Sequence, residues 1–219
     1  MEKKLTKRQQ QYLETMDSIR SAVDKLVAEI GFDSMRIQDI CGEAGISVGA
    51  FYHYFASKNA VFVDRYRRRN AYYRKLYNEQ LILMNHVDAL KEFAAELLKY
   101  TQTRVPGVLR FYSKAIIDEY GTWNGEDGDA VLEICAALVE RGQAEGTVST
   151  LYEPKSIAMM FNDYYRGIMV SERISPGTDE EYEARRQVMF DWLETLRAAR
   201  QGEKVPTESA LRLFASDFI

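Results

Sequence analysis

The segment 34–58, SMRIQDICGEAGISVGAFYHYFASK, decides the fold of the first part of this chain. Its first half predicts a short helix that Ser34 caps and that ends near Glu43. Gly45 follows as the turn, because glycine adopts a positive φ without steric cost. A second short helix, rich in aromatic residues, is expected over 47–54. The order of helix, tight turn and helix predicts a helix-turn-helix.

The flanking segments continue the helical pattern. Apolar residues recur at helical spacing between Thr6 and Ile30, and Gly31 is a natural stop at the C-terminal end of that helix. Ser57 is expected to cap a long helix that runs into the 70s. No proline occurs before Pro106, so none interrupts a helix in the first half of the chain.

The remaining two thirds of the chain also predict helices. Stripes of apolar residues at helical spacing are found in the segments 90–98, 108–120, 131–138, 154–174 and 179–200. A polar, glycine-rich loop is expected over 121–128. The predicted fold class is therefore all-α. We expect a helix-turn-helix domain over 1–60, joined by a long helix to a helical domain over 61–219.

The composition argues against several classes of protein. With 46% hydrophobic residues and four prolines, the 219-residue chain has enough apolar side chains for a core and is not expected to be disordered. It has no apolar run of roughly 20 residues, as a membrane-spanning helix needs, and no signal peptide pattern, so a cytoplasmic location is expected. Cys41 and Cys135 are too few for a disulfide framework or a thiolate metal site. No cofactor is expected.

The charge is unevenly distributed along the chain. Residues 1–80 hold 14 Lys/Arg and 10 Asp/Glu, whereas the remaining residues hold 15 and 23. This asymmetry predicts a basic module attached to an acidic body, with a chance distribution of solvated charges as the alternative. One run of arginines is interpreted as a solvated helix face rather than as a direct contact surface: Arg65, Arg67, Arg68, Arg69 and Arg74.

The segment 44–62, AGISVGAFYHYFASKNAVF, resembles the signature of the TetR family of transcriptional regulators. In that pattern an Ala-Gly-[Val/Ile]-Ser turn leads into Gly-x-[Leu/Phe]-Tyr-x-[His/Tyr]-Phe and Ser-Lys, and the match runs without a gap from Asp39 to Phe62. The resemblance implies a homodimer that binds a palindromic operator in double-stranded DNA. It also implies a repressor that a small hydrophobic or aromatic effector releases. Activation in place of repression, or the absence of an effector, stays open.

The resemblance further implies which side chains meet DNA. Those expected to contact phosphates or bases, or to permit close approach, are Ser47, Val48, Gly49, Ala50, Tyr52, His53 and Lys58. Of these, Tyr52, His53 and Lys58 are expected on phosphate oxygens. Beside the resemblance, Arg36 and Gln38 are expected to contact DNA because they offer the long polar side chains of this segment. Packing is the alternative for Tyr52, and simple solvation is the alternative for His53. Phe51 and Phe55 are expected in the core.

Some positions depart from the family pattern. Met35 and Arg36 stand where the family commonly has Thr or Ser against the DNA backbone. Val48 and Ala50 are apolar at positions where readers of guanine carry Arg or Lys, so thymine methyl groups are the expected contacts.

In the second domain the resemblance implies an effector pocket and a two-fold interface. The residues expected to line the pocket are Tyr100, Arg104, Phe111, Tyr112, Trp123, Cys135, Phe161, Tyr164 and Tyr165. The interface is expected to pair the helices over 154–174 and 179–200 with their mates through Phe161, Ile168, Met189, Trp192, Leu193 and Leu196. Packing within a single chain is the alternative for every one of these residues.

Two other classes of protein fit the sequence less well. The only histidines are His53 and His86, and no spacing of Cys, His or carboxylates indicates a catalytic centre or a metal site. No enzyme activity is therefore expected. A helical interaction module would not need a helix of small residues followed by Tyr-His-Tyr-Phe and Ser-Lys.

Overall fold

The computed structural model describes residues 5–102, 129–174 and 177–198, and every helix or strand assigned in these ranges is a helix. In chain order the helices are α1 (Lys7–Ile30), α2 (Ile37–Ala44), α3 (Val48–Tyr54), α4 (Lys58–Glu79), the 3₁₀ helix η1 (Leu81–Leu83), α5 (His86–Gln102), α7 (Ala130–Ala144), α8 (Pro154–Ile174) and α9 (Asp179–Thr195). The predicted all-α class is confirmed. The helix expected over 108–120 and the loop expected over 121–128 lie outside the described residues.

Four of the described helices begin at hydroxyl caps, with Thr178 before α9 as the fourth. The side chain of Thr6 accepts a hydrogen bond from the backbone N–H of Gln9 at 3.3 Å, which opens α1. Ser47 caps α3 and Ser57 caps α4 in the same way, each at 3.1 Å from the N–H three residues on. Each cap satisfies one of the N–H groups that a helix leaves without an internal partner. The predicted starts of these helices are therefore confirmed.

The first short helix begins later than the sequence predicts. Ser34 does not cap it, because α2 begins at Ile37 and its N-cap residue is Arg36. The carboxylate of Asp39 accepts the backbone N–H of Arg36 at 2.8 Å and so takes over part of the capping role. An acidic side chain in the first turn also suits the positive end of the helix dipole.

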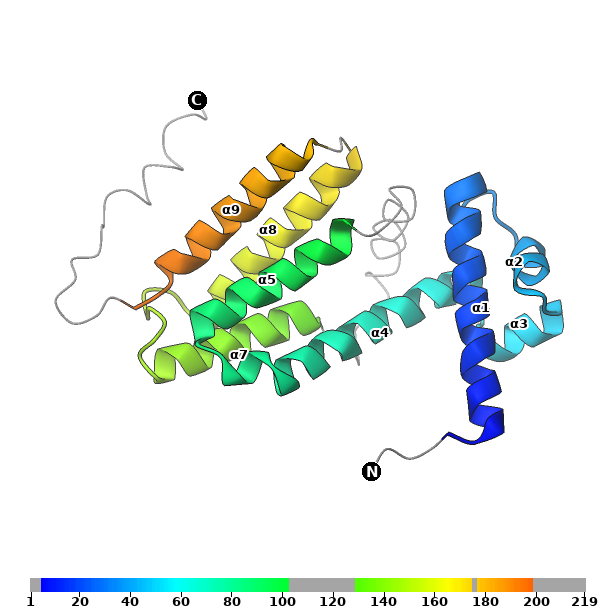
Figure 1. Ribbon diagram of the computed structural model, residues 1–219, viewed down its shortest axis with the longest axis horizontal. Helices are drawn as coiled ribbons and strands as arrows, with labels where there is room; N and C mark the ends of the chain where they lie inside the picture. Colours follow the sequence, from blue (N-terminus) through cyan, green and yellow to red (C-terminus); the bar gives the residue numbers. More distant parts are fainter. Residues whose placement is uncertain (1–4, 103–128, 175–176, 199–219) are drawn as a thin grey trace.

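The described residues form two separate hydrophobic cores. The smaller core joins α1, α2, α3 and the start of α4, where Val61 and Phe62 are buried. The larger core joins α5, α7, α8 and α9 to the far end of α4, where Tyr73 and Leu76 are buried. Figure 1 shows α4 as the helix that connects the two groups of helices. A movement of the larger core can therefore reach the smaller one through α4.

The end of α9 is fastened to the loop after α7. The helix stops at Thr195, before the predicted end at residue 200, because the chain turns there to pair with an extended segment. Val148 and Arg197 form an isolated antiparallel bridge, and Leu196 accepts the N–H of Ser149 at 2.8 Å. The packing of α7 on α8, and of α5 on α9, completes this half of the molecule.

Candidate nucleic-acid interface

The turn between α2 and α3 depends on the left-handed conformation of one glycine. Gly45 has φ 67° and ψ 34°, and its N–H donates to the carbonyl oxygens of Cys41 and Gly42. The N–H of Ile46 also donates to the carbonyl oxygen of Cys41, at 3.0 Å. These bonds satisfy the last carbonyl groups of α2 and reverse the chain within two residues. The predicted role of Gly45 is confirmed.

Helix α3 has one buried face and one exposed face. Phe51 and Phe55 are buried in the smaller core, as the sequence predicts. The opposite face exposes Val48, Tyr52 and His53, and 55% of Tyr52 is accessible. Because the buried aromatic residues hold the helix on the core, this face lies free on the surface of the domain.

The first turn of α3 combines small side chains with a cap. Gly49 is exposed and Ala50 is half-buried, so the backbone there can approach another surface closely. Tyr54, at the other end of α3, is half-buried, and its ring lies 5.0 Å from that of Tyr12 on α1. That contact supports a packing role for Tyr54.

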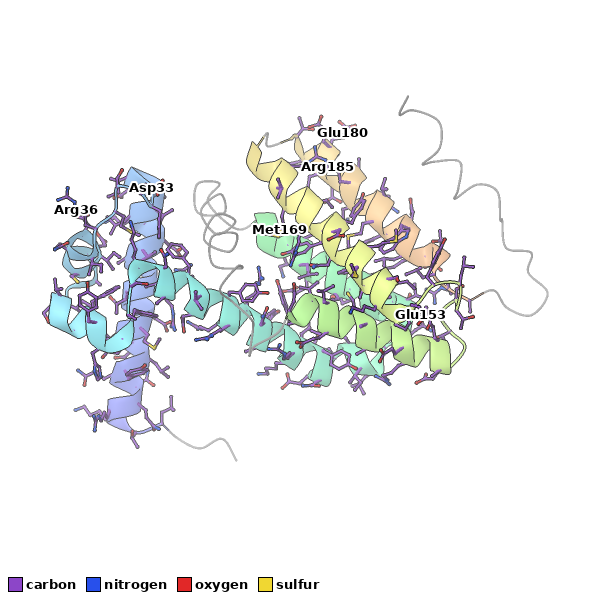
Figure 2. All side chains as sticks on the ribbon, turned by 180° about the vertical axis from the view of Figure 1, so that it is seen from behind. Asp33, Arg36, Glu153, Met169, Glu180 and Arg185 are labelled. Carbon is purple, nitrogen blue, oxygen red and sulfur yellow. The ribbon has the colours of Figure 1, made fainter. Side chains whose placement is uncertain are left out.

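The two unusual residues before α2 lie in opposite surroundings. Met35 is buried in the smaller core, so its side chain anchors the loop and does not reach the surface. Arg36 and Gln38 are exposed. Figure 2 shows Arg36 at the outer edge of the helix-turn-helix, pointing away from the rest of the chain. The departure at Met35 thus leaves Arg36 as the long polar side chain at the start of α2.

The ammonium group of Lys58 is directed into the protein. It donates to the carbonyl oxygens of Phe32 at 2.9 Å and Met35 at 3.0 Å. It also lies 4.2 Å from the centroid of the Phe32 ring. No local sequence pattern indicates these contacts, because the two carbonyl groups belong to a loop more than 20 residues earlier.

The arginine run on α4 is largely paired with acidic residues of other helices. Arg65 binds Asp24 at 2.6 Å, Arg68 binds Asp17 at 3.0 Å, and Arg74 binds Glu133 of α7 at 2.9 Å. These three guanidinium groups therefore connect α4 to its neighbours. Arg65 is largely buried, which differs from the predicted solvated face, whereas Arg67 and Arg68 are exposed, as predicted.

One of these acidic residues has a perturbed pKa. Burial raises the pKa of Asp17, but hydrogen bonds from Arg20 and Arg68 outweigh burial, so the pKa lies below its ordinary value. Arg20 itself is buried between Asp17 and Asp64, and both carboxylates lie 2.6 Å from its guanidinium group. The junction of α1 and α4 is thus held by charge as well as by apolar packing.

The predicted effector pocket is only partly within the described residues. Arg104, Phe111, Tyr112 and Trp123 lie outside them, as does the side chain of Tyr100. The remaining predicted lining residues are all in the second group of helices: Cys135, Phe161, Tyr164 and Tyr165. Of these, Cys135, Phe161 and Tyr165 are buried core residues.

Aromatic residues that the sequence analysis did not single out join this group. The Phe161 ring stacks on that of Phe93 at 6.0 Å with an interplanar angle of 7°, and Tyr73 meets Phe93 edge to face at 5.5 Å. The hydroxyl of Tyr164 donates to the carbonyl oxygen of Arg185 at 3.2 Å. The helical stripe containing Phe93 was the available signal, but it does not separate a pocket from a core.

Most residues of the predicted dimer interface are buried within one chain. Trp192 is half-buried, and the other five lie in the larger core: Phe161, Ile168, Met189, Leu193 and Leu196. Their side chains are not available to a second chain. Large apolar side chains exposed on α8 and α9 are instead Met159, Met160, Val170 and Val188.

The described residues contain no group of three or more His, Cys, Asp or Glu side chains arranged to hold a metal ion. Burial raises the pKa of both thiols, and for Cys135 the charge of Asp129 raises it further. Both thiols are therefore poor nucleophiles.

Among the described helices, none is both long enough and apolar enough to cross a lipid bilayer.

Helix α3 follows a left-handed glycine turn and packs one face on a small bundle of helices. This arrangement defines a helix-turn-helix protein. Residues 19–64 match the family model of the bacterial regulatory proteins, tetR family. Residues 19–64 are therefore similar to the DNA-binding segment of that family, and the described chain has the fold seen in solved structures of TetR-family transcriptional regulators. The predicted resemblance is confirmed.

Solved structures share this fold at low sequence identity. A TetR transcription regulator from Haloarcula marismortui is 18% identical, with TM-score 0.66, over 84% of this chain and 99% of that chain. The fatty acid degradation regulator FadR from Bacillus halodurans is 16% identical, with TM-score 0.63, over 87% and 96%. The reduced form of Escherichia coli NemR is 19% identical, with TM-score 0.62, over 85% and 99%. A comparison with curated protein sequences found no match.

Proposed function

We propose that this protein is a ligand-responsive transcriptional regulator that binds a palindromic operator as a homodimer. The observation that carries the proposal is the free outer face of α3, which combines small residues with Tyr52 and His53 over a buried aromatic base. A recognition helix needs this arrangement, because its first residues must enter the major groove while its rear face packs on the domain.

The proposed contacts divide by chemistry. Tyr52 and His53 meet phosphate oxygens and fix the position of the domain. Residues at the start of α3 meet base edges, with apolar contact to thymine methyl groups from Val48 and Ala50. Gly49 permits the close approach. Arg36 and Gln38 supply long polar side chains from α2, so they are the residues suited to hydrogen bonds with bases or phosphates.

Dimer formation is proposed through α8 and α9. One recognition helix covers only a few base pairs. Dimeric DNA-binding proteins with two-fold symmetry therefore place two such helices roughly 34–36 Å apart, or a multiple of that distance, on successive turns of DNA. The apolar side chains exposed on α8 and α9 provide the surface: Met159, Met160, Val170 and Val188. Single exposed apolar residues are ordinary, but four on two adjacent helices suit an interface with a second copy.

Effector release is proposed to act through α4. A small hydrophobic or aromatic molecule suits the aromatic residues near Phe93 and Phe161. Because α4 contributes to both cores and is ion-paired to α1, a shift of α4 changes the spacing of the two recognition helices. A complete reversal of the population requires the effector to prefer the released conformer by about 5.5 kcal/mol. The proposed outcome is relief of repression.

One experiment tests the DNA-binding proposal directly. Purified protein is mixed with sheared genomic DNA of its source, and bound fragments are recovered and sequenced at several salt concentrations. An enriched palindrome with salt-dependent recovery is expected. Recovery of random fragments only would refute operator binding.

A matched pair of tyrosine variants tests the interface on the recovered site. Tyr52→Phe should weaken binding about three- to tenfold, because one hydrogen bond to a phosphate is lost. Tyr72→Phe is the control, since Tyr72 is a comparably exposed tyrosine on α4 whose hydroxyl donates to Glu96. Equal effects of the two variants on DNA affinity would show that the Tyr52 hydroxyl does not contact DNA.

A further inference from the structure

The resemblance to the family signature implies that Lys58 contacts a DNA phosphate. In the structure, however, its ammonium group is already bound within the chain. Two carbonyl oxygens of the loop between α1 and α2, those of Phe32 and Met35, lie 2.9 and 3.0 Å from its nitrogen. The Phe32 ring covers a third side, at 4.2 Å from nitrogen to centroid. Since an ammonium group has three N–H donors, two of them are used by these carbonyl groups.

The location of Lys58 on its helix explains why it needs such partners. It is the first residue of α4, at the positive end of the helix dipole, where a lysine is normally disfavoured. The partial negative charges of two carbonyl oxygens and the face of an aromatic ring compensate this. The contacts therefore stabilise the charge of Lys58 in the absence of DNA.

The same contacts lie directly before the start of α2. Phe32 and Met35 are both buried in the smaller core, and the N–H of Met35 donates to the Phe32 carbonyl at 3.1 Å. Met35 directly precedes Arg36, the N-cap residue of α2. A single side chain of α4 thus holds the short turn from which the helix-turn-helix starts.

We propose that Lys58 is a positioning residue, which holds the loop between α1 and α2 against the start of α4 and so sets the placement of α2 and α3 relative to α4. It does not neutralise a phosphate. The inference rests on the proposed function, because the placement matters through DNA binding. It also makes Lys58 one of the links through which a movement of α4 reaches the helix-turn-helix, beside the ion pairs of α4 with α1.

The test compares three variants of the full-length protein. Lys58→Met keeps the length and apolar character of the stem but removes the charge and the N–H donors. Lys58→Arg restores donors. Val61→Ala is the matched control, since Val61 is fully buried in the smaller core one turn further along α4. Removing methyl groups there destabilises the domain while the hydrogen bonds of Lys58 are retained.

Hydrogen exchange supplies a readout that needs no DNA. Lys58→Met should accelerate amide exchange in residues 33–40, whereas Val61→Ala, at a comparable loss of Tm of about 2–6 °C, should leave that segment unchanged. Lys58→Arg should recover most of the protection. Unchanged exchange in Lys58→Met would overturn the proposal.

Binding to a short DNA duplex of mixed sequence supplies the second readout. The folded Lys58→Met protein should bind about tenfold more weakly, with the same slope of log affinity against log salt, while Val61→Ala keeps its affinity. If Lys58 instead neutralised one phosphate, Lys58→Met would reduce the magnitude of that slope by about 0.9, and this result would overturn the proposal. If the wild type bound no duplex at all, the proposed function would fail, and the exchange result alone would decide whether Lys58 holds the loop.

Discussion

The guanidinium group of Arg20 on α1 lies 2.6 Å from the carboxylate of Asp64 on α4, and only 8% of Arg20 is exposed. Its Nε donates to the same carboxylate oxygen at 2.8 Å, and its Nη1 lies 2.6 Å from the carboxylate of Asp17. A charge buried this far is tolerated only while it is paired. The first two turns of α4 are therefore attached to α1 by a pair that cannot be broken without cost.

Removal of Asp64 should be strongly destabilising. In Asp64→Ala the buried guanidinium group keeps only Asp17, whose side chain is mostly exposed, so the free energy of unfolding should fall by about 2–4 kcal/mol. Urea unfolding followed by circular dichroism measures it. Glu133→Ala is the control, because it breaks a pair with Arg74 in which both side chains are well exposed, and it should cost at most about 1 kcal/mol. Similar small losses in both variants would show that Arg20 is effectively hydrated.

Local features of the fold could be predicted from the sequence, and long-range pairs could not. The cap at Ser57 and the turn at Gly45 depend on neighbours within a few residues and were predicted from their residue types, whereas the cap expected at Ser34 was wrong because α2 begins after Arg36. The pair of Arg20 with Asp64 joins residues 44 positions apart, and no local pattern marks it.

The assignment of helix faces shows the same limit. On α8, Met159 and Met160 are exposed whereas the adjacent Phe161 is fully buried. A hydrophobic stripe indicates that a face is apolar but does not say whether its own chain or a second copy covers it. For this reason the predicted interface residues Met189 and Leu193 belong to the core, and the surface proposed for dimerisation follows from their exposed neighbours.

Two glycines of the helix-turn-helix should respond in opposite directions to alanine. At Gly45 an added Cβ meets no atom within 4 Å, but the backbone has φ 67°, so Gly45→Ala should cost about 1 kcal/mol through backbone strain alone. Gly42 is equally open but lies in α2 with helical geometry, so Gly42→Ala should stabilise by roughly 0.5–1 kcal/mol. Chemical unfolding of both variants decides this. Stabilisation by both would mean that the turn relaxes out of the left-handed region.

Acid should weaken the attachment of α9 to α5. Hydrogen bonds from Arg197 and then Lys91 lower the pKa of Glu194 from 4.5 to about 2. A depressed pKa in the folded state adds stability that is complete above the unfolded-state pKa and is lost as pH falls from about 4.5 toward 2. The side chain is 45% exposed, so screening by solvent limits the effect to about 0.5–1 kcal/mol.

Glu194→Gln should therefore be less stable than the wild type at pH 7, and the difference should shrink as the pH falls below about 4.5. Urea unfolding between neutral and acidic pH measures it. Glu140→Gln is the control, because Glu140 is an exposed carboxylate of α7 for which no ion pair is found among the described residues. A difference that is independent of pH would show that the ion pairs of Glu194 do not contribute to stability.

A charge placed on the exposed apolar face of α8 should separate the proposed dimer. Met160 is 52% exposed, so Met160→Arg should leave the single-chain fold intact while placing a charge that a dry interface cannot solvate. Light scattering coupled to size exclusion should show a shift from dimer to monomer, with an unchanged helical signal in circular dichroism. Leu83→Arg is the control, because Leu83 is 82% exposed on η1, away from α8 and α9. A dimer that survives Met160→Arg but dissociates in Leu83→Arg would place the interface at the other end of the helical domain.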